Sequence, residues 1–266
     1  MEQKFYKTLS IQVSLGGLSF CILDAETNTI TQYKRIIFDK KLGPTNLLDK
    51  LKHLFNTETV LQQNFKTVQL VHKNELATLV PKSLFNEDCI ADYLKFNTKI
   101  LPTDFITYDA IATEDMVNVY VPYVNINNYI YDTFGAFEFK HFSSILLENI
   151  LSQQAHYQSN RMYIHVETSH FEIIVTKGHK FLYYNSFEYS TKTDFIYYVL
   201  FVAEQLELNP EVFEAILLGF ITAEDELYDI LYTYVRHVSF YKFASKHRIA
   251  TNIKTLNKDF TLLNSF

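Results

Sequence analysis

The chain has 266 residues, of which 48% are hydrophobic and 20% charged, and its formal net charge is -6 at pH 7. This length allows a sizeable core in one large domain or two small ones, and the acidic balance argues against a general nucleic-acid binder. The first residues lack the apolar core of a signal peptide, and no apolar run approaches a membrane span. The only cysteines, Cys21 and Cys89, indicate neither a disulfide framework nor a zinc site. We therefore expect a cytoplasmic protein with reduced cysteines.

The first 72 residues predict three antiparallel strands, a helix and a fourth strand. Two β-rich runs flank the turn LGG, which is typical of a hairpin, and we expect Gly16 and Gly17 to adopt positive φ there. Pro44 suits the first turn of a helix whose leucines recur on one face. The expected strands are 8–14, 18–24, 30–38 and 66–72.

The next segment, about 74–140, is less regular and reads as an insertion. A helix is expected at 87–96 and a hairpin at 104–112 and 116–124. A short helix at 125–134 and an edge strand at 136–142 would follow. A helix then runs to residue 155, with Ser143 as its predicted N-cap.

The opening pattern then returns. Strands are expected at 161–167, 170–178 and 179–189, followed by a helix with Thr193 or Asp194 near its cap. A buried strand at 213–220, a helix at 223–235 capped by Thr222 and a last strand at 237–243 complete the chain.

Both halves therefore share the order β-β-β-α-β, an internal repeat. Sliding Val13 onto Val166 brings Leu18 onto Phe171, and the apolar positions that follow stay in step. We expect an α/β protein with a first half at 1–158, which contains the insertion, and a second half at 159–266.

A duplicated β-β-β-α-β unit resembles the actin, hexokinase and heat-shock-70 ATPase superfamily, itself similar to ribonuclease H. Within that superfamily, its order of strands and helices most resembles that of the pilus-assembly members. As a whole it is similar to a family of uncharacterised Bacteroidetes proteins, a domain of unknown function with an actin-like ATPase fold. The resemblance implies two ribonuclease H-like halves packed across a cleft.

Active members of the superfamily open each half with an apolar-Asp-apolar-Gly-Thr turn. The Asp helps to hold the metal and its water, and the small residues let backbone N–H groups approach phosphate. In the first half, "IQVSLGG" falls on this motif, with Gln12 at the acidic position and Ser14 at the glycine. The hairpin glycines that follow are either a relic of the phosphate turn or an ordinary two-residue turn, and we favour the second.

In the second half, "IHVETSH" falls on the same motif. His165 replaces the Asp and Glu167 the glycine, while Thr168 and Ser169 fit the small hydroxyl positions. A third signature of the superfamily, an apolar strand running into Gly-Gly, appears as "ILLGFIT". The candidate residues of a relic nucleotide cleft are Gly16, Gly17, Thr168, Ser169 and Gly219.

Three departures from the motifs argue against ordinary ATP hydrolysis. Gln12 is neutral and cannot help to hold magnesium, and Glu167 places a carboxylate near a polyphosphate. Phe220 puts a bulky ring where backbone should pass close to adenosine. The resemblance therefore implies a non-catalytic binding or scaffold protein with another protein as its partner and with no catalytic residues, metal or cofactor. The alternative is a weak or active ATPase or kinase that binds ATP and magnesium through rearranged residues.

Other arrangements are less specific. A metal site is conceivable at His165, His170 and His179 with Glu167, although polar residues near a strand end more often face solvent. A hydrolase of the ribonuclease H style needs clustered carboxylates, for which Asp24, Asp109, Asp132 and Asp194 are available. The segment "SFEYSTKTD" lacks the glycine elbow of a serine nucleophile. A basic group at Lys177, Lys180 and Lys192 is expected to be a solvated face.

Overall fold

The structure, a computed structural model, describes residues 6–96, 98–153, 159–178, 180–242, 246–251, 253 and 259–266. Its contacts divide the chain into two compact units. Unit 1 comprises residues 1–146, 245–254 and 261–266, and unit 2 comprises residues 147–244 and 255–260. The last residues of the chain thus return to unit 1. The predicted division after residue 158 adjoins residues 154–158, which lie outside the described residues.

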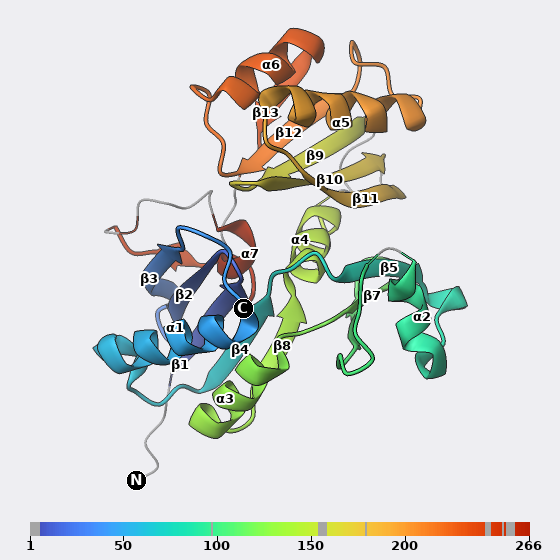
Figure 1. Cartoon of the computed structure of the whole chain (residues 1–266). Coiled ribbons are helices and arrows are strands. Elements are labelled where there is room, and N and C mark those ends of the chain that lie inside the picture. The colour runs from blue at the N-terminus through green and yellow to red at the C-terminus, as the bar shows by residue number, and fades with distance from the viewer. Residues whose placement is uncertain are drawn as a thin grey trace. The chain divides into compact units, whose positions relative to one another are not determined.

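Unit 1 is built on a six-stranded sheet in the order β14-β3-β2-β1-β4-β8 (Figure 1). Its strands are β1 (Lys7–Ser14), β2 (Gly17–Asp24), β3 (Thr29–Ile37), β4 (Thr67–His72), β8 (Glu138–His141) and β14 (Arg248–Ile249). The first three strands form an antiparallel meander, and β4 and β8 run parallel to β1.

Helices α1 (Pro44–Thr57) and α3 (Val124–Phe134) cover one face of this sheet (Figure 1). Pro44 stands at the first helical position, and the 3-10 helix η1 (Thr59–Leu61) follows α1. The buried side of α1 repeats at helical spacing through Leu47, Leu51 and Leu54, which pack with Ile11 and other apolar residues of β1 and β2. Each fully buried leucine contributes about 1.5–3 kcal/mol to the sheet–helix contact.

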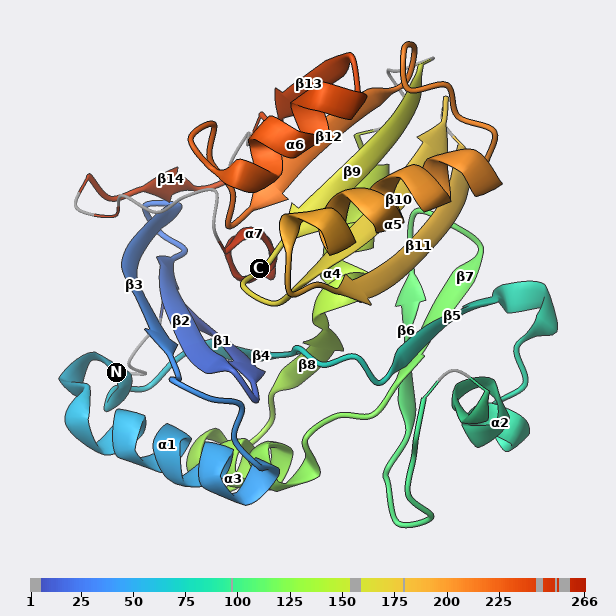
Figure 2. The ribbon, with the colours of Figure 1, turned by 45° about the horizontal axis from the view of Figure 1, so that its top comes forward.

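A separate three-stranded sheet lies within the predicted insertion (Figure 2). It consists of β5 (Ala77–Pro81), β7 (Met116–Tyr120) and β6 (Thr107–Ile111). Helix α2 (Ile90–Lys95) and the 3-10 helices η2 (Lys82–Leu84) and η3 (Glu87–Cys89) lie in the same segment. Strand β5 was not predicted, and α2 begins three residues late because Asn86 caps η3 instead. Of the segment 74–140, only the part from β5 to β7 forms this sheet, since α3 and β8 belong to the first core.

Helix α4 (Phe142–Leu151) starts one residue before the predicted cap. Ser143 therefore lies inside the first turn, and the prediction of a serine N-cap is wrong. Its Oγ lies 2.6 Å from Nδ1 of His141 and accepts a hydrogen bond from Nδ2 of Asn118 at 2.9 Å. The hydroxyl serves a buried polar network rather than the helix end.

Unit 2 has a five-stranded sheet in the order β11-β10-β9-β12-β13, with both helices on one face (Figure 1). Its elements are β9 (Asn160–Val166), β10 (His170–Lys177), β11 (Lys180–Glu188), α5 (Lys192–Gln205), β12 (Glu214–Gly219), α6 (Glu226–Tyr234) and β13 (His237–Phe240).

The helix caps of unit 2 differ in detail from those expected. Thr191 is the N-cap of α5, and Thr193 and Asp194, which were expected near the cap, lie in the first turn, where Asp194 is the partner of Thr191 in a reciprocal capping box. Asp225, not Thr222, stands at the N-cap of α6, and its carboxylate accepts a hydrogen bond from the N–H of Thr222. None of the helices in the described part of the chain is long and apolar enough to cross a membrane.

The two large sheets have the same strand order and matching register. In unit 1, Val13 pairs with Leu18, and in unit 2, Val166 pairs with Phe171. These are the four positions that the sequence alignment superposed. Apart from β14, which is added to β3, each sheet is a three-stranded meander followed by two parallel strands.

Candidate functional site

The glycine turn of unit 1 is a two-residue hairpin, but neither glycine has positive φ. The prediction of positive φ at Gly16 and Gly17 is therefore wrong. A Cβ on Gly17 would lie 2.5 Å from the carbonyl oxygen of Ile36, whereas a Cβ on Gly16 would meet nothing nearer than 3.9 Å. Gly17 is thus required by the close approach of β3, and Gly16 is exposed at the tip of the turn.

Gln12 is held in a buried contact within unit 1. Its Oε1 accepts a hydrogen bond of 2.6 Å from Oγ1 of Thr261, and only 6% of the residue is exposed. The neighbouring Ser10 makes a similar contact, with its Oγ 2.6 Å from that of Ser265. The C-terminal segment, residues 261–266, therefore covers the sheet face opposite α1, and Gln12 is part of this packing contact.

The corresponding turn of unit 2 carries the exposed hydroxyl residues Thr168 and Ser169. They link β9 to β10, and the carbonyl of Ser169 accepts a hydrogen bond from the N–H of Tyr189. Glu167 precedes them and is 6% exposed, and its carbonyl accepts a 2.7 Å hydrogen bond from the Tyr189 hydroxyl. A buried carboxylate therefore stands at the base of this turn.

His165 is paired across the strands with Glu172, and both are almost wholly buried. Nδ1 of His165 donates to Oε2 of Glu172 at 2.6 Å, and Nε2 of His170 lies 3.3 Å from Oε1. Burial alone would raise the pKa of Glu172, but the hydrogen bonds from the two histidines hold that pKa well below its usual range. On the other side of the His165 ring, Nε2 is 3.8 Å from Oε1 of Glu167.

Gly219 ends β12 with φ of +91°, and a Cβ there would lie 2.3 Å from the carbonyl oxygen of Val166. No other residue type fits this position without a backbone shift. The register of unit 1 places His72 at the equivalent position, opposite Val13. The half-buried Phe220 follows Gly219, and its N–H donates to the same carbonyl of Val166.

These residues do not form a magnesium site. Within the described part of the chain, no group of three or more His, Cys, Asp or Glu side chains is suited to hold a metal ion. Gln12 is neutral and engaged by Thr261, and His165 is engaged by Glu172. The candidate metal ligand His179 lies outside the described residues. The residues present therefore do not fit the magnesium–ATP complex that the superfamily implies.

The four aspartates considered for a hydrolase have separate structural contacts or are exposed, as follows. Asp24 accepts hydrogen bonds from the backbone of its own turn, and Asp194 belongs to the capping box. Asp132 lies exposed on α3. Asp109 is buried, and its carboxylate accepts from Ser144 Oγ at 2.6 Å and from Tyr120 at 3.0 Å. Burial raises the pKa of Asp109 despite these hydrogen bonds.

The polar network around Asp109 was missed by sequence reasoning. It joins β6 and β7 to the start of α4, and the N–H of His141 donates to Asp109 at 2.8 Å. The ring of His141 is turned to Ser143 and to the carbonyl of Asn74, so it does not face the carboxylate. Serine, histidine and aspartate are thus close together without the order of a catalytic triad. The alternating polar positions of β6 and β7 gave no signal that distinguishes them from solvent-facing residues.

The predicted basic group is not a cluster of three. Lys177 and Lys180 are opposite one another at the ends of β10 and β11. Lys192 instead forms an exposed ion pair with Glu226 at 3.4 Å.

Comparison with known proteins agrees with this architecture. The sequence matches, over residues 1–238, the family model described as "Protein of unknown function (DUF3822)". None of the curated proteins matches it. Its structure is similar to a Bacteroides thetaiotaomicron VPI-5482 protein with an actin-like ATPase fold and unknown function, with a TM-score of 0.80 and 24% identity over 89% of this chain and 91% of that one.

A second similar structure is the PilM–PilN type IV pilus biogenesis complex. It has a TM-score of 0.64 and 10% identity, and 96% of each chain is covered. Together, these similarities confirm the predicted fold class and the resemblance on which it was based. The fold is that of the actin-like ATPases.

Proposed function

The chain belongs to the DUF3822 family of proteins of unknown function, and we propose that it is a degenerate, non-catalytic actin-like ATPase that binds another protein. This proposal rests on the environment of Gln12. At the position where active members of the superfamily have a metal-holding acid, a neutral, buried side chain bonds to Thr261 at 2.6 Å. A carboxylate is lacking, and the C-terminal segment occupies that sheet face.

Unit 2 supports the same proposal. Its equivalent position is His165, which is committed to Glu172, and Glu167 adds a second buried carboxylate beside it. Two carboxylates near a polyphosphate would repel it by kilocalories in a low-dielectric site. Of the candidate relic residues, Gly17 and Gly219 would then be kept because another backbone passes close to them, whereas Gly16, Thr168 and Ser169 are exposed.

A protein partner is supported by the PilM–PilN complex, in which a protein of the same fold is found with another protein. The net charge of -6 disfavours nucleic acid. We also propose that the two halves of the sequence, divided near residue 158, arose by duplication. The shared strand order and the constant offset of 153 positions between β1–β2 and β9–β10, as in Val13 to Val166 and Leu18 to Phe171 (166 - 13 and 171 - 18), support this. The proposed compartment is the cytoplasm, with both thiols reduced.

Calorimetry with ATP and magnesium tests the non-catalytic proposal. We expect binding no tighter than millimolar, equivalent to roughly 4 kcal/mol, and no ATP hydrolysis. Micromolar binding would favour the alternative, an ATPase or kinase with rearranged residues. The double variant Gln12→Asp, Glu167→Gly restores one acid and removes one misplaced charge, so it should bind ATP more tightly than the parent. The variant Glu211→Gly, at an exposed acid of unit 2, is the matched control for charge removal.

Affinity purification tests the protein-partner proposal. The tag belongs at the N-terminus, because the C-terminal segment is packed in unit 1. We expect a stoichiometric protein partner whose recovery does not change when ATP is added. Recovery that requires ATP would contradict the proposal.

A further inference from the structure

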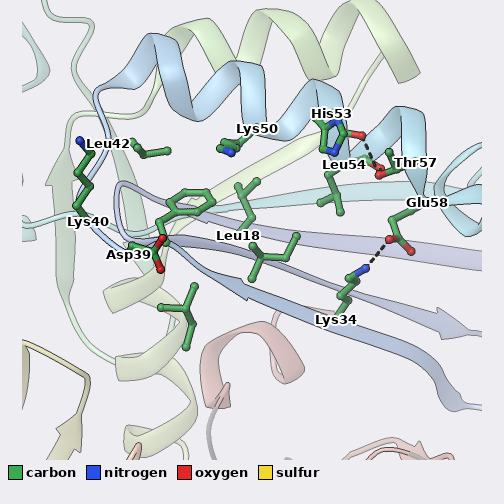
Figure 3. Close-up of a pocket in the computed structure, with 13 residues that line it drawn as sticks. Leu18, Lys34, Asp39, Lys40, Leu42, Lys50, His53, Leu54, Thr57 and Glu58 are labelled. Atoms are coloured by element: carbon green, nitrogen blue, oxygen red, sulfur yellow. Dashed lines mark hydrogen bonds and ion pairs between the residues drawn. The ribbon is translucent and has the colours of Figure 1, made fainter.

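A groove lies between α1 and β3 of unit 1 and encloses about 540 Å³ (Figure 3). Its floor is apolar and includes Leu18, Ile36, Leu42 and Leu54. Leu18 and Ile36 lie on the helix-covered face of the sheet, opposite the face that bears Gln12. The groove is therefore separate from the degenerate nucleotide motif. Pockets that bind small molecules commonly have volumes of ~300–1,000 Å³.

The groove exists because unit 1 and unit 2 differ at equivalent positions. The β2–β3 and β10–β11 registers make Leu18 equivalent to Phe171 and Ile36 equivalent to Phe187. Helices α1 and α5 have 14 residues each, and their buried residues fall at matching positions when each helix is counted from its first residue. On this count, Lys50 of α1 is equivalent to Tyr198 of α5.

In unit 2, these equivalent positions are filled by aromatic rings. The rings of Phe187 and Tyr198 stack with their centroids 4.8 Å apart, and Phe171 lies 5.6 Å from Phe187. Unit 1 has two aliphatic side chains and a lysine in their place. The same fold thus has a filled space in one unit and an open groove in the other.

Cationic side chains surround the opening. Lys40 and Lys50 make no ion pair within the part of the chain that the structure describes, and the exposed His53 lies one turn further along α1. Lys34 is neutralised by Glu58 at 2.5 Å, which leaves Asp39 as the other acid of the rim. Three lysines against two carboxylates leave the rim with a net positive charge, although the whole chain is acidic.

Lining residues stand at both ends of the groove. The ion pair of Lys34 and Glu58 joins β3 to the end of α1, and the segment 38–42 lies at the opposite end (Figure 3). An extended peptide needs an open path along the groove, whereas a single hydrocarbon chain with one charged end needs only a floor and a cationic rim. The geometry favours the single chain.

We propose that the α1–β3 groove binds a small amphipathic carboxylate. The hydrocarbon chain lies on the apolar floor, and the carboxylate is held at the rim by Lys40 and Lys50. This binding does not depend on whether the protein binds ATP, since the groove and the candidate nucleotide residues of unit 1 are on opposite faces of its sheet.

Calorimetric titration of the full chain with hexanoate, octanoate and decanoate tests the proposal. Affinity should rise about fourfold for each methylene added, because each buried methylene contributes a constant transfer free energy. Decanol should bind more weakly than decanoate, because it lacks the charge. Equal affinity across the series, or for the alcohol, would overturn the proposal.

Two kinds of variant locate the binding. Lys50→Tyr copies Tyr198 of the filled unit and should reduce decanoate affinity at least tenfold. Ile36→Phe, which copies Phe187, is a second filling variant if the first does not fold. Lys50→Ala should weaken binding about threefold, as for an exposed ion pair. Lys52→Ala, on the same helix but directed to Tyr129, should leave it unchanged.

Undiminished decanoate binding by a folded filling variant would refute the groove as the site. An extended peptide of alternating leucine and glutamate serves as the competing occupant. If it binds more tightly than decanoate and Lys50→Tyr abolishes that binding, the occupant is a partner's strand and the proposal is wrong.

Discussion

Acidification is expected to destabilise unit 1 through His72, the last residue of β4. Its side chain is completely buried, Nε2 lies 2.8 Å from Oδ1 of Asn127, and Nδ1 accepts a hydrogen bond from the N–H of Tyr123 at 3.2 Å. Burial lowers the pKa of His72 to about 4, and the hydrogen bond to Asn127 only partly opposes this shift. The ring is neutral at pH 7.

The direction of the effect follows from the lowered pKa. In the unfolded chain His72 takes up a proton near the ordinary histidine pKa of 6.5, whereas in the folded protein it does so only near 4. The stabilising contribution is therefore complete above the unfolded pKa and is lost as the pH falls from there towards 4. Between pH 7 and pH 5, the titration of His72 should lower the free energy of unfolding by about 2 kcal/mol. Below pH 4, where the ring is protonated in the folded protein as well, the loss due to His72 should reach about 3 kcal/mol.

Urea unfolding of the parent and of His72→Gln at pH 7 and pH 5 measures this contribution. The variant has no titrating group at this position, so its free energy of unfolding should fall by about 2 kcal/mol less than that of the parent. His53→Gln, at an exposed histidine, should behave as the parent. NMR titration gives a second reading if His72→Gln does not fold. A His72 ring resonance that titrates near pH 6.5 in the folded protein would refute the reasoning.

Three further predictions concern stability and can be measured by urea unfolding. Gly17→Ala should cost about 1–3 kcal/mol because of the close carbonyl of β3, whereas Gly16→Ala should change stability by no more than about 0.5 kcal/mol; equal effects would contradict the distinction between them. Glu172→Gln should lower the free energy of unfolding by about 3 kcal/mol at pH 7. This difference in stability from the parent should shrink below pH 4.5, the pKa of glutamate in the unfolded chain, because the lowered pKa of Glu172 stabilises the fold only above that value. A difference that stays constant with pH would argue against an ionised Glu172. Thr261→Val should cost about 1–2 kcal/mol because it leaves the buried acceptor of Gln12 without its donor, and an unchanged stability would show that this contact is unimportant.

Strand pairing was predictable because it depends on a short-range pattern. The alternation of apolar residues in β1 and β2 has a period of two, and shifting it by one residue would turn Val13 and Leu18 away from the core. The same pattern in β9 and β10 therefore allowed the two halves to be superposed correctly. The helix caps were predicted less well, because several Ser, Thr and Asp residues near each start satisfy the same local rule.

The candidate site was harder to predict because its contacts are distant in the chain. Nothing near Gln12 indicates that Thr261, 249 positions away, donates to it. The prediction of positive φ in the glycine turn failed for a related reason. Gly17 is required because it lies close to Ile36 on another strand, not because of its own φ. His165 and Glu172 are only seven positions apart, but their pairing depends on which residues of β9 and β10 lie opposite one another.

The return of residues 261–266 to unit 1 has a consequence for biosynthesis. Ser10 and Gln12 leave the ribosome well before their hydrogen-bonding partners Ser265 and Thr261, which lie 255 and 249 positions later in the chain. Until residues 261–266 have been translated, the face of the first sheet that carries these side chains lacks the cover that they provide. Domains commonly fold in order from the N-terminus during translation, but unit 1 acquires its last segment only after unit 2 has been made. A chain that stops before residue 259 can therefore form the β-meander of unit 1 without being able to close it.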